Sequence, residues 1–508
     1  MLRPSSTGPL PESSASQDSE PPYHILSKKQ KWNLVILVSL AGSFSPLSSN
    51  IYFPAIGSIS SDLGVGASIV ALTITVYMVA QGIAPSLFGA LSDTKGRRLA
   101  FTISLAIYTA ANLALAFTSS YPMLMALRGV QAAGSAATIS ISAGVIADIA
   151  CPQERGSFMG TNAGVRMTGQ AIGPIIGGVL NSAWGYRSIF WLLFTLSIIV
   201  LGALLIFLPE TQRSIAGNGS APLSGFYKPF IYTLKVPMVG TESHETSHSM
   251  NHRTPISLKK ACSPLTYIFE KDIAALLAWG AVAYTAWSMV TSSTTTMLLH
   301  GFPFLTQWQI GLCFLPNGLG CICGSLSTGW LLDKSFRIVE AQYKAERDIS
   351  PEDNIDSRDF PYVKARLRIM PFFSIVLVIS LALYGPSFEF NDLRHYFGPN
   401  LAAPLILQFL ISFTATAIFN INSTVLIDCF PDRPASATAL NNLCRCILGA
   451  AGVSVIQPLI GAVKEMVAFF IVTSVVFLFT PLIWVEWKFG ERWRREREKR
   501  LTRWIWQS

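Results

Sequence analysis

The sequence is divided into long runs of apolar residues, each about as long as one crossing of a lipid bilayer. A helix of about 20 apolar residues spans the hydrocarbon core, and it satisfies its own backbone hydrogen bonds where no water is present. Only 13% of the 508 residues are charged, whereas soluble domains average about 25%. The chain is therefore predicted to be an all-α membrane protein.

Twelve apolar runs can be placed, and a long polar stretch divides them into two groups of six. The predicted spans are 33–53, 68–90, 99–118, 122–147, 157–181, 187–208, 273–298, 308–332, 368–386, 401–427, 436–460 and 466–487. The predicted domains are a disordered head (1–31), a first six-helix bundle (32–208), a central loop (209–272), a second six-helix bundle (273–487) with an insert (333–367), and a basic tail (488–508).

The basic residues predict the orientation of the chain. If both termini are cytosolic, three of the 38 lysines and arginines fall in outer loops and three fall within spans, which leaves 32 in cytosolic segments. Lysine and arginine are concentrated in the cytosolic loops of membrane proteins, so we predict cytosolic termini. The net charge of +9 lies beside the spans, so no nucleic-acid partner is predicted. The sequence shows no catalytic triad, metal cluster or phosphate-binding loop.

Residues at corresponding positions indicate that the two halves are repeats of one unit. The matched pairs are the GxLxD segments 89–93 and 329–333, Asp148 and Asp428 at span ends, and Arg166 and Arg445, which follow those acids by 18 and 17 residues. Two repeats with a binding site at their interface is a common transporter architecture. We therefore expect a site between the two bundles.

Three motifs resemble those of the major facilitator superfamily. Residues 89–98 (GALSDTKGRR) match its signature loop between spans two and three, and residues 128–134 (RGVQAAG) look like its span-four motif. Residues 169–178 (GQAIGPIIGG) look like the span-five motif of its antiporters and exporters. The resemblance implies a major facilitator fold, with twelve transmembrane helices in two pseudo-symmetric six-helix bundles.

The same motifs imply which residues act in gating. A carboxylate such as Asp93 can hold a neighbouring helix end in one conformation and release it in the other, and Pro174 permits bending among small residues that allow close packing. For Arg128, about two turns from the outer face, a structural or gating role and substrate contact both stay open. The predicted gating residues are Gly89, Asp93, Lys95, Gly96, Arg97, Arg98, Arg128, Asp148, Gly173, Pro174, Asp333 and Asp428.

Other segments narrow the resemblance. Residues 45–54 are similar to the fungal twelve-span drug:proton antiporters, and residues 209–219, 228–232, 284–295 and 441–446 look like the fungal citrate exporters. This implies a transporter and not an enzyme, placed in the plasma membrane, that exports citrate or a related di- or tricarboxylate. A multidrug:proton antiporter of the quinidine-resistance type, an exporter of a carboxylated secondary metabolite and a vacuolar location stay open.

Two arginines lie deep in the predicted membrane region. Arg166 and Arg445 are each nine residues into a span, about 14 Å deep at 1.5 Å per residue. An arginine at the bilayer centre costs at least about 2.5–3.5 kcal/mol, so both are expected to face a water-filled cavity, where guanidinium groups suit carboxylates. The alternative is that they cap carbonyls or pair with acids. The spans carry no acid near their centres, which favours anionic over cationic substrates.

Polar residues near these arginines are predicted to complete the substrate site. Four in the seventh span share one helical face at spacings of three and four, and two lie one turn from an arginine. Interhelical hydrogen bonding is the alternative for each. The predicted substrate-binding residues are Arg166, Arg445, Tyr284, Trp287, Ser288, Thr291, Gln170, Asn441, Asn317 and Asn420.

The expected partners are a small anionic substrate, the lipid bilayer and, if transport is proton-coupled, protons. The protein is expected to act as a monomer without a cofactor. The basic tail is expected either to lie on anionic lipid as a helix or to be solvated.

Overall fold

The computed structural model describes residues 24–150, 152–219, 227–228, 268–347, 360–389, 401–429 and 434–505, and these ranges contain helices and no strand. The first half contains α1 (Lys28–Asn50), η1 (Phe53–Ala55), α2 (Ile56–Leu63), α3 (Ala67–Lys95), α4 (Arg97–Ala116), α5 (Tyr121–Ile149), α6 (Pro152–Trp184), α7 (Arg187–Phe207) and α8 (Arg213–Ala216). The second half contains α10 (Lys271–Gly301), α11 (Gln307–Leu312), α12 (Leu315–Glu346), α13 (Tyr362–Leu367), α14 (Met370–Tyr384), α15 (Pro386–Glu389), α17 (Ala402–Cys429), α18 (Pro434–Phe479) and α19 (Pro481–Ile505). The predicted head up to residue 23 and most of the predicted central loop lie outside the described residues.

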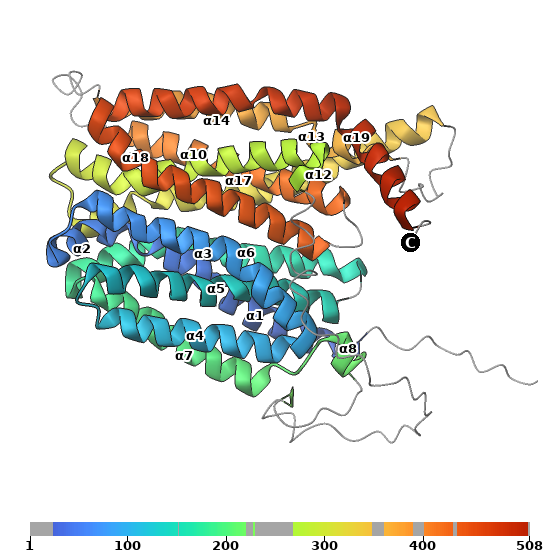
Figure 1. Cartoon of the computed structure of the whole chain (residues 1–508), viewed down its shortest axis with the longest axis horizontal. Helices are drawn as coiled ribbons and strands as arrows, with labels where there is room; N and C mark the ends of the chain where they lie inside the picture. Colours follow the sequence, from blue (N-terminus) through green and yellow to red (C-terminus); the bar gives the residue numbers. More distant parts are fainter. Residues whose placement is uncertain are drawn as a thin grey trace, which may run out of the picture.

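The helices of each half pack into their own bundle. In the first half α3, α4 and α1 pack on α5, and α1 also packs on α6; in the second half α12, α14 and α10 pack on α17, and α10 also packs on α18. Figure 1 shows the two halves as two layers, the first half below the second. The bundles meet along two seams, α3 against α18 and α6 against α11 and α12. This is the predicted major facilitator architecture.

Charged side chains gather at one end of the molecule, called here the basic end. Ion pairs at this end join Lys31 to Glu154, Arg366 to Asp428 and Arg97 to Asp148. In the described part of the chain, Arg187 with Asp62 is the ion pair at the opposite end. Figure 1 shows α2 at the opposite end, and α8 and α19 at the basic end.

Ten helical stretches in the described residues are long and apolar enough to cross a membrane, compared with twelve predicted spans. One of the ten stretches contains both the eleventh and the twelfth spans, which are joined at Lys464, where φ is 64°. The predicted fifth span, α6, is not among the ten. Because α6 carries Arg166 and Gln170 and lies on the seam between the bundles, its composition is more polar than that of a helix facing lipid.

The predicted insert after the eighth span continues as a helix. α12 extends to Glu346 because Phe336, Val339 and Tyr343 recur at helical spacing and pack against Phe360. Burial of these apolar side chains offsets the conformational entropy that is lost when the segment becomes ordered.

Glycines on the two seams show where the bundles touch. Toward the opposite end, a Cβ on Gly311 would lie 2.7 Å from the carbonyl oxygen of Pro174, and a Cβ on Gly318 would overlap Ala171. Toward the basic end of the seam helices, the added Cβ would meet nothing within 4 Å at Gly89, Gly160, Gly164 and Gly329. The bundles are therefore in contact at the opposite end and separated at the basic end.

Replacing Gly318 with alanine is expected to push the bundles apart at the opposite end. The new methyl group would overlap the backbone of Ala171 only while the bundles touch there, and overpacking of this kind costs about 1–3 kcal/mol. The population of the closed opposite end should fall by roughly 5- to 150-fold. Hydrogen–deuterium exchange should then increase over residues 307–314.

Gly329→Ala is the matched control, because a Cβ at Gly329 on the same helix meets nothing within 4 Å. It should leave the exchange pattern of residues 307–314 unchanged. Equal exchange in Gly318→Ala and the parent would show that the seam tolerates the methyl group and that contact at Gly318 does not hold the bundles together.

Candidate functional site

Arg166 lies on α6 and has no hydrogen bond or ion pair from its side chain among the described residues. Its side chain crosses Gly42 of α1, where an added Cβ would lie 3.4 Å from the Cδ atom of Arg166. Its Nε atom is buried and has no hydrogen-bond partner, and none of the ion pairs among the described residues includes it. A buried donor of this kind is costly unless something else binds it. Arg166 is therefore positioned to bind a ligand acceptor.

Arg445 lies on α18 and is held on one edge. Its Nε and Nη2 atoms donate to Oδ1 of Asn442, at 3.0 and 2.7 Å. Its guanidinium also lies 4.4 Å from the centre of the Phe419 ring and 4.8 Å from that of Tyr284. Like Arg166, it has no carboxylate partner among the described residues. Two aromatic rings and one amide thus fix the group without neutralising it.

A continuous set of contacts joins the two arginines across the bundle interface. The rings of Tyr284 and Trp287 lie 5.3 Å apart, and Nε1 of Trp287 donates to Oδ1 of Asn317 at 2.9 Å. Asn317 is one turn from Cys321, whose sulfur accepts a hydrogen bond from Nε2 of Gln170 at 3.1 Å. Gln170 is one turn from Arg166. The charge of Arg445 also acts on Arg166, so the two guanidiniums repel each other.

This central cluster consists of Arg166, Gln170, Tyr284, Trp287, Asn317 and Arg445. All six are among the predicted substrate-binding residues. The first bundle contributes two of them, both on α6, and the second bundle contributes four, on α10, α12 and α18, so each bundle contributes one arginine. The cluster lies at the interface between the two bundles, where α6 packs against α12.

The other four predicted substrate-binding residues make different contacts. The hydroxyl groups of Ser288 and Thr291 are buried and donate to the carbonyls of Tyr284 and Trp287 on their own helix, both at 2.9 Å. Asn420 donates to Oγ of Ser325 at 3.2 Å. These bonds fit the alternative that such residues join or stabilise helices.

Asn441, predicted because it lies one turn before Arg445, contacts a neighbouring helix and not the arginine. Asn441 is buried, and its Nδ2 atom donates to Oγ of Ser423 on α17 at 2.9 Å. The next residue, Asn442, holds Arg445 instead. Positions three and four residues before an arginine both lie near its side chain on a helix, so spacing alone could not separate them.

Asn442 also reaches the other bundle. While its Oδ1 atom accepts from Arg445, its Nδ2 atom donates to the carbonyl of Gln81 on α3 at 3.0 Å. The neighbouring Gly82 packs closely on Cys446, where an added Cβ would lie 3.0 Å from the cysteine Cβ. Asn442 therefore connects the Arg445 guanidinium directly to the α3–α18 seam.

Arg128 belongs to the interior of the first bundle. It is 1% exposed, and its guanidinium lies 4.2 Å from the centre of the Tyr52 ring and 4.4 Å from that of Tyr77. Its Nη1 atom donates to Oε1 of Gln131 at 2.6 Å and to the Ser48 carbonyl at 3.3 Å. This enclosure favours the structural role over substrate contact.

The signature loop forms an ion-pair network at the basic end of the first bundle. Arg97 pairs with Asp93 at 2.5 Å and with Asp148 at 2.9 Å. The network brings together three of the predicted gating residues, from α3, α4 and α5. All three helices are in one bundle, so in this conformation the network does not cross the interface.

Glu210 completes this network, and its role was not predicted. Its carboxylate is buried and accepts from the backbone N–H groups of Arg97 (2.8 Å) and Arg98 (3.2 Å) at the start of α4. A negative charge at a helix N-terminus is stabilised by the helix dipole. Gly96, with φ of 104°, is required here because a Cβ would overlap the Glu210 carboxylate.

The other two basic residues of the signature loop are Lys95 and Arg98. The guanidinium of Arg98 donates to the carbonyls of Leu205 and Leu208, at the end of α7. The Lys95 side chain is exposed. Gly89 makes no close approach, whereas Gly173 packs on α1 and Pro174 on Gly311. Gly173 and Pro174 therefore lie in the closed half of the seam.

The second bundle does not repeat the network symmetrically. Asp428 pairs with Arg366 of α13 at 3.0 Å, as Asp148 pairs with Arg97. Asp333, the predicted counterpart of Asp93, is exposed and has no ion pair among the described residues. The predicted gating role of Asp333 therefore has no ion pair to support it among the described residues in this conformation.

The basic tail packs against the second bundle. In α19, Arg494 pairs with Glu491 at 3.4 Å, and Arg497 pairs with Asp272 of α10 at 3.1 Å. Both arginines are buried. This part of the tail is therefore neither solvated nor spread on lipid.

No group of His, Cys, Asp and Glu in the described ranges could hold a metal ion. The six cysteines there, Cys313, Cys321, Cys323, Cys429, Cys444 and Cys446, are free thiols. The central cluster is thus made of cationic, amide and aromatic groups.

Comparisons with known proteins show which family and fold this chain resembles. The model of the Major Facilitator Superfamily matches residues 38–453. Citrate exporter 1 of Aspergillus niger is 45% identical over 500 residues, which cover 98% of this chain and 93% of that protein. MFS antiporter QDR2 of Candida albicans is 33% identical over 91% of this chain and 89% of its own. The crystal structure of the human organic anion transporter MFSD10 (TETRAN) shares the fold, with a TM-score of 0.58, 16% identity and coverage of 89% of this chain and 99% of that one.

Proposed function

Because this chain belongs to the major facilitator superfamily, we propose that it exports an anionic organic acid, a di- or tricarboxylate such as citrate, by alternating access. It is a multi-pass membrane transporter of a small molecule. The observation that carries the choice of an anion is the pair of deep guanidiniums, one in each bundle, neither of which is neutralised by a carboxylate in the described chain. The 45% identity to a citrate exporter favours the same class.

The proposed orientation places the basic end in the cytosol of a cell with this protein in its plasma membrane. The positive-inside rule supports it. In that orientation the bundles are open to the cytosol and closed on the outer side, which is the state that loads an exported substrate.

A polycarboxylate would bridge Arg166 and Arg445. Each guanidinium can bind a carboxylate through two parallel hydrogen bonds, and a bound anion removes the repulsion between the two positive charges. The bundles then approach each other around the anion at the basic end. An inside-negative potential favours outward movement by about 2.3 kcal/mol per charge per 100 mV, so export does not require a proton, although protons can be coupled to it.

Asn442 would transmit binding to the opposite end. The Nε–Nη2 edge of Arg445 is one of its bidentate edges, and Asn442 occupies it. An anion that takes this edge displaces Asn442, whose bond to Gln81 across the α3–α18 seam is then lost. Substrate binding thereby weakens the contacts that keep the outer side closed.

A multidrug:proton antiporter is the second candidate, because MFS antiporter QDR2 is 33% identical to this chain. A cationic drug exchanged for protons needs a carboxylate that binds either one. The central cluster contains two arginines and no acid. Anionic or neutral drugs would still fit this second function.

Overexpression of the chain in a fungal cell is expected to raise extracellular citrate or a related acid at least about threefold. The cell membrane potential supplies the driving force. The measurement is organic-acid profiling of the medium, with quinidine resistance assayed in the same strains. Substitution of Arg166 or Arg445 by alanine should abolish this increase. Arg187→Ala is the matched control for these two variants, because Arg187 is a half-exposed arginine at the opposite end with a surface ion pair. Unchanged acid levels together with increased quinidine resistance would replace the exporter with the antiporter.

A further inference from the structure

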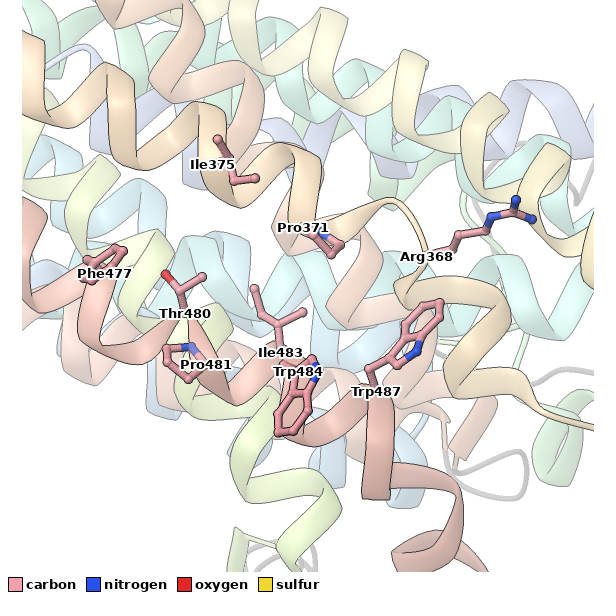
Figure 2. Close-up of a pocket in the computed structure, with 9 residues that line it drawn as sticks. All are labelled: Arg368, Pro371, Ile375, Phe477, Thr480, Pro481, Ile483, Trp484 and Trp487. Carbon is pink, nitrogen blue, oxygen red and sulfur yellow. The ribbon is translucent and has the colours of Figure 1, made fainter.

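A groove lies on the outside of the second bundle, between α14 and the junction of α18 with α19. Its volume is about 620 Å³. Figure 2 shows Pro371 and Ile375 on one wall, Phe477, Pro481 and Trp484 on the other, and Arg368 beyond Trp487 at one end. The groove is away from the central cluster.

The groove exists because two helices are interrupted beside each other. α18 ends at Phe479 and α19 begins at Pro481, since proline has no N–H to continue the backbone ladder and clashes with the preceding turn. Pro371 occupies the first turn of α14 on the facing wall. The two proline sites leave the depression between the helices unfilled.

The apolar part of the groove faces lipid. Phe477 is 64% exposed, Ile375 58% and Trp484 62%, and exposed apolar side chains on transmembrane helices contact acyl chains. From Phe477 to Trp487 the lining extends ten residues along the helix, about 15 Å. That is half of a hydrocarbon core of about 30 Å, so the groove is as long as one leaflet is deep.

The end of the groove nearest the basic end is cationic and aromatic. Arg368 is exposed and has no hydrogen bond or ion pair within the described residues. Nζ of Lys488 lies 5.0 Å from the centre of the Trp484 ring. The one acid next to these groups in sequence, Glu486, is buried on the inner side of α19. Tryptophan prefers the membrane interface, and basic residues there attract anionic lipid headgroups.

We propose that this groove binds one phospholipid with an anionic headgroup. One acyl chain lies between Ile375 and Phe477, and the headgroup phosphate accepts from Arg368 and is attracted to Lys488. In the proposed orientation, the lipid comes from the cytosolic leaflet. The site is independent of the transported substrate, because it lies on α14 and α19 and contains none of the residues of the central cluster.

The test uses the full chain purified in detergent, with phosphatidylserine and phosphatidylcholine of identical acyl chains added in equal amounts. Native mass spectrometry should show one retained phosphatidylserine, at least about tenfold more than phosphatidylcholine. The double variant R368Q/K488Q should lower its retention by roughly 30-fold, because two basic contacts are lost. Ile375→Trp should also lower it by filling the groove.

Two matched controls distinguish binding of phosphatidylserine in this groove from general contact of lipid with the protein surface. Lys334→Gln removes an exposed lysine that also lies over a tryptophan, Trp330, at 5.0 Å but outside the groove. Ile379→Trp enlarges an exposed isoleucine one turn further along α14, outside the lining. Both controls should retain phosphatidylserine as the parent does. Equal retention of the two lipids by the parent, or equal losses in the controls, would overturn the proposal.

Discussion

Replacing Arg166 with methionine is expected to abolish export and, at the same time, to stabilise the protein. Export should fall at least about 100-fold, because the substrate loses a bidentate, charge-assisted contact worth several kcal/mol. The folded protein loses a buried Nε that nothing in the described chain binds. Replacing buried ion pairs by apolar groups of similar volume is often neutral or stabilising by about 1–4 kcal/mol, and an unpaired buried charge has no partner whose attraction would be lost.

Arg128→Met is the matched control for this prediction. Arg128 is more deeply buried than Arg166, and its Nε and Nη2 atoms also lack a hydrogen-bond partner. Two tyrosine rings and Gln131 nevertheless hold its guanidinium, so its loss should destabilise the protein by about 1–3 kcal/mol. Thermal unfolding of the purified variants gives the stability, and efflux of labelled citrate from loaded vesicles gives the transport rate. A less stable Arg166→Met that still exports would mean that Arg166 has a structural role and that the anion site lies elsewhere.

Replacing Asn442 with aspartate is expected to block anion binding and to open the opposite end without any substrate. The aspartate has nearly the same shape, so its carboxylate would lie against the edge of Arg445 that now contacts Oδ1 of Asn442. The charge of Arg445 is then neutralised from within, and citrate affinity should fall at least about 100-fold. The carboxylate cannot donate to the Gln81 carbonyl, so the bond across the α3–α18 seam is lost as well.

Two neighbouring substitutions separate these effects. Asn442→Ala removes the seam bond and leaves Arg445 charged, so citrate should still bind while the opposite end opens more readily. Asn441→Asp adds the same charge one residue away, next to Ser423 and not Arg445, and should bind citrate within about threefold of the parent. Calorimetric titration with citrate measures binding, and hydrogen–deuterium exchange over residues 307–314 measures opening. If Asn442→Asp binds citrate as the parent does, Arg445 is not the anion ligand.

The two arginines show which features of a membrane protein can be predicted from its residue pattern. Their depth followed from counting along the spans, because every transmembrane helix rises by the same amount per residue. Their lack of an acidic partner was expected because the spans carry no central acids, and none of the ion pairs among the described residues includes either arginine. Asp93 and Arg97 were predicted as gating residues from their motif and Asp148 from its position in the repeat, and the structure brings the three side chains together in one network.

Choices between adjacent residues could not be made in the same way. Asn441 and Asn442 both lie about one turn before Arg445, and only the packing of α18 between α17 and α3 decides which of them meets the guanidinium. Asp333 matches Asp93 in sequence, yet Arg366 of a separate short helix pairs with Asp428 and leaves Asp333 exposed. Glu210 lies far along the chain from the α4 start that it caps, so no local pattern pointed to it.

The division of the chain into membrane spans, the repeat of the two halves and the matched positions of Arg166 and Arg445 could be predicted from the sequence alone, because the bilayer imposes a fixed length and a high cost of buried charge on every segment. The tertiary structure decided which end of the bundles is closed, which amide holds Arg445 and where a groove opens toward lipid. These features depend on contacts between side chains on different helices, at distances of a few ångströms, and such contacts exist only after the helices have packed.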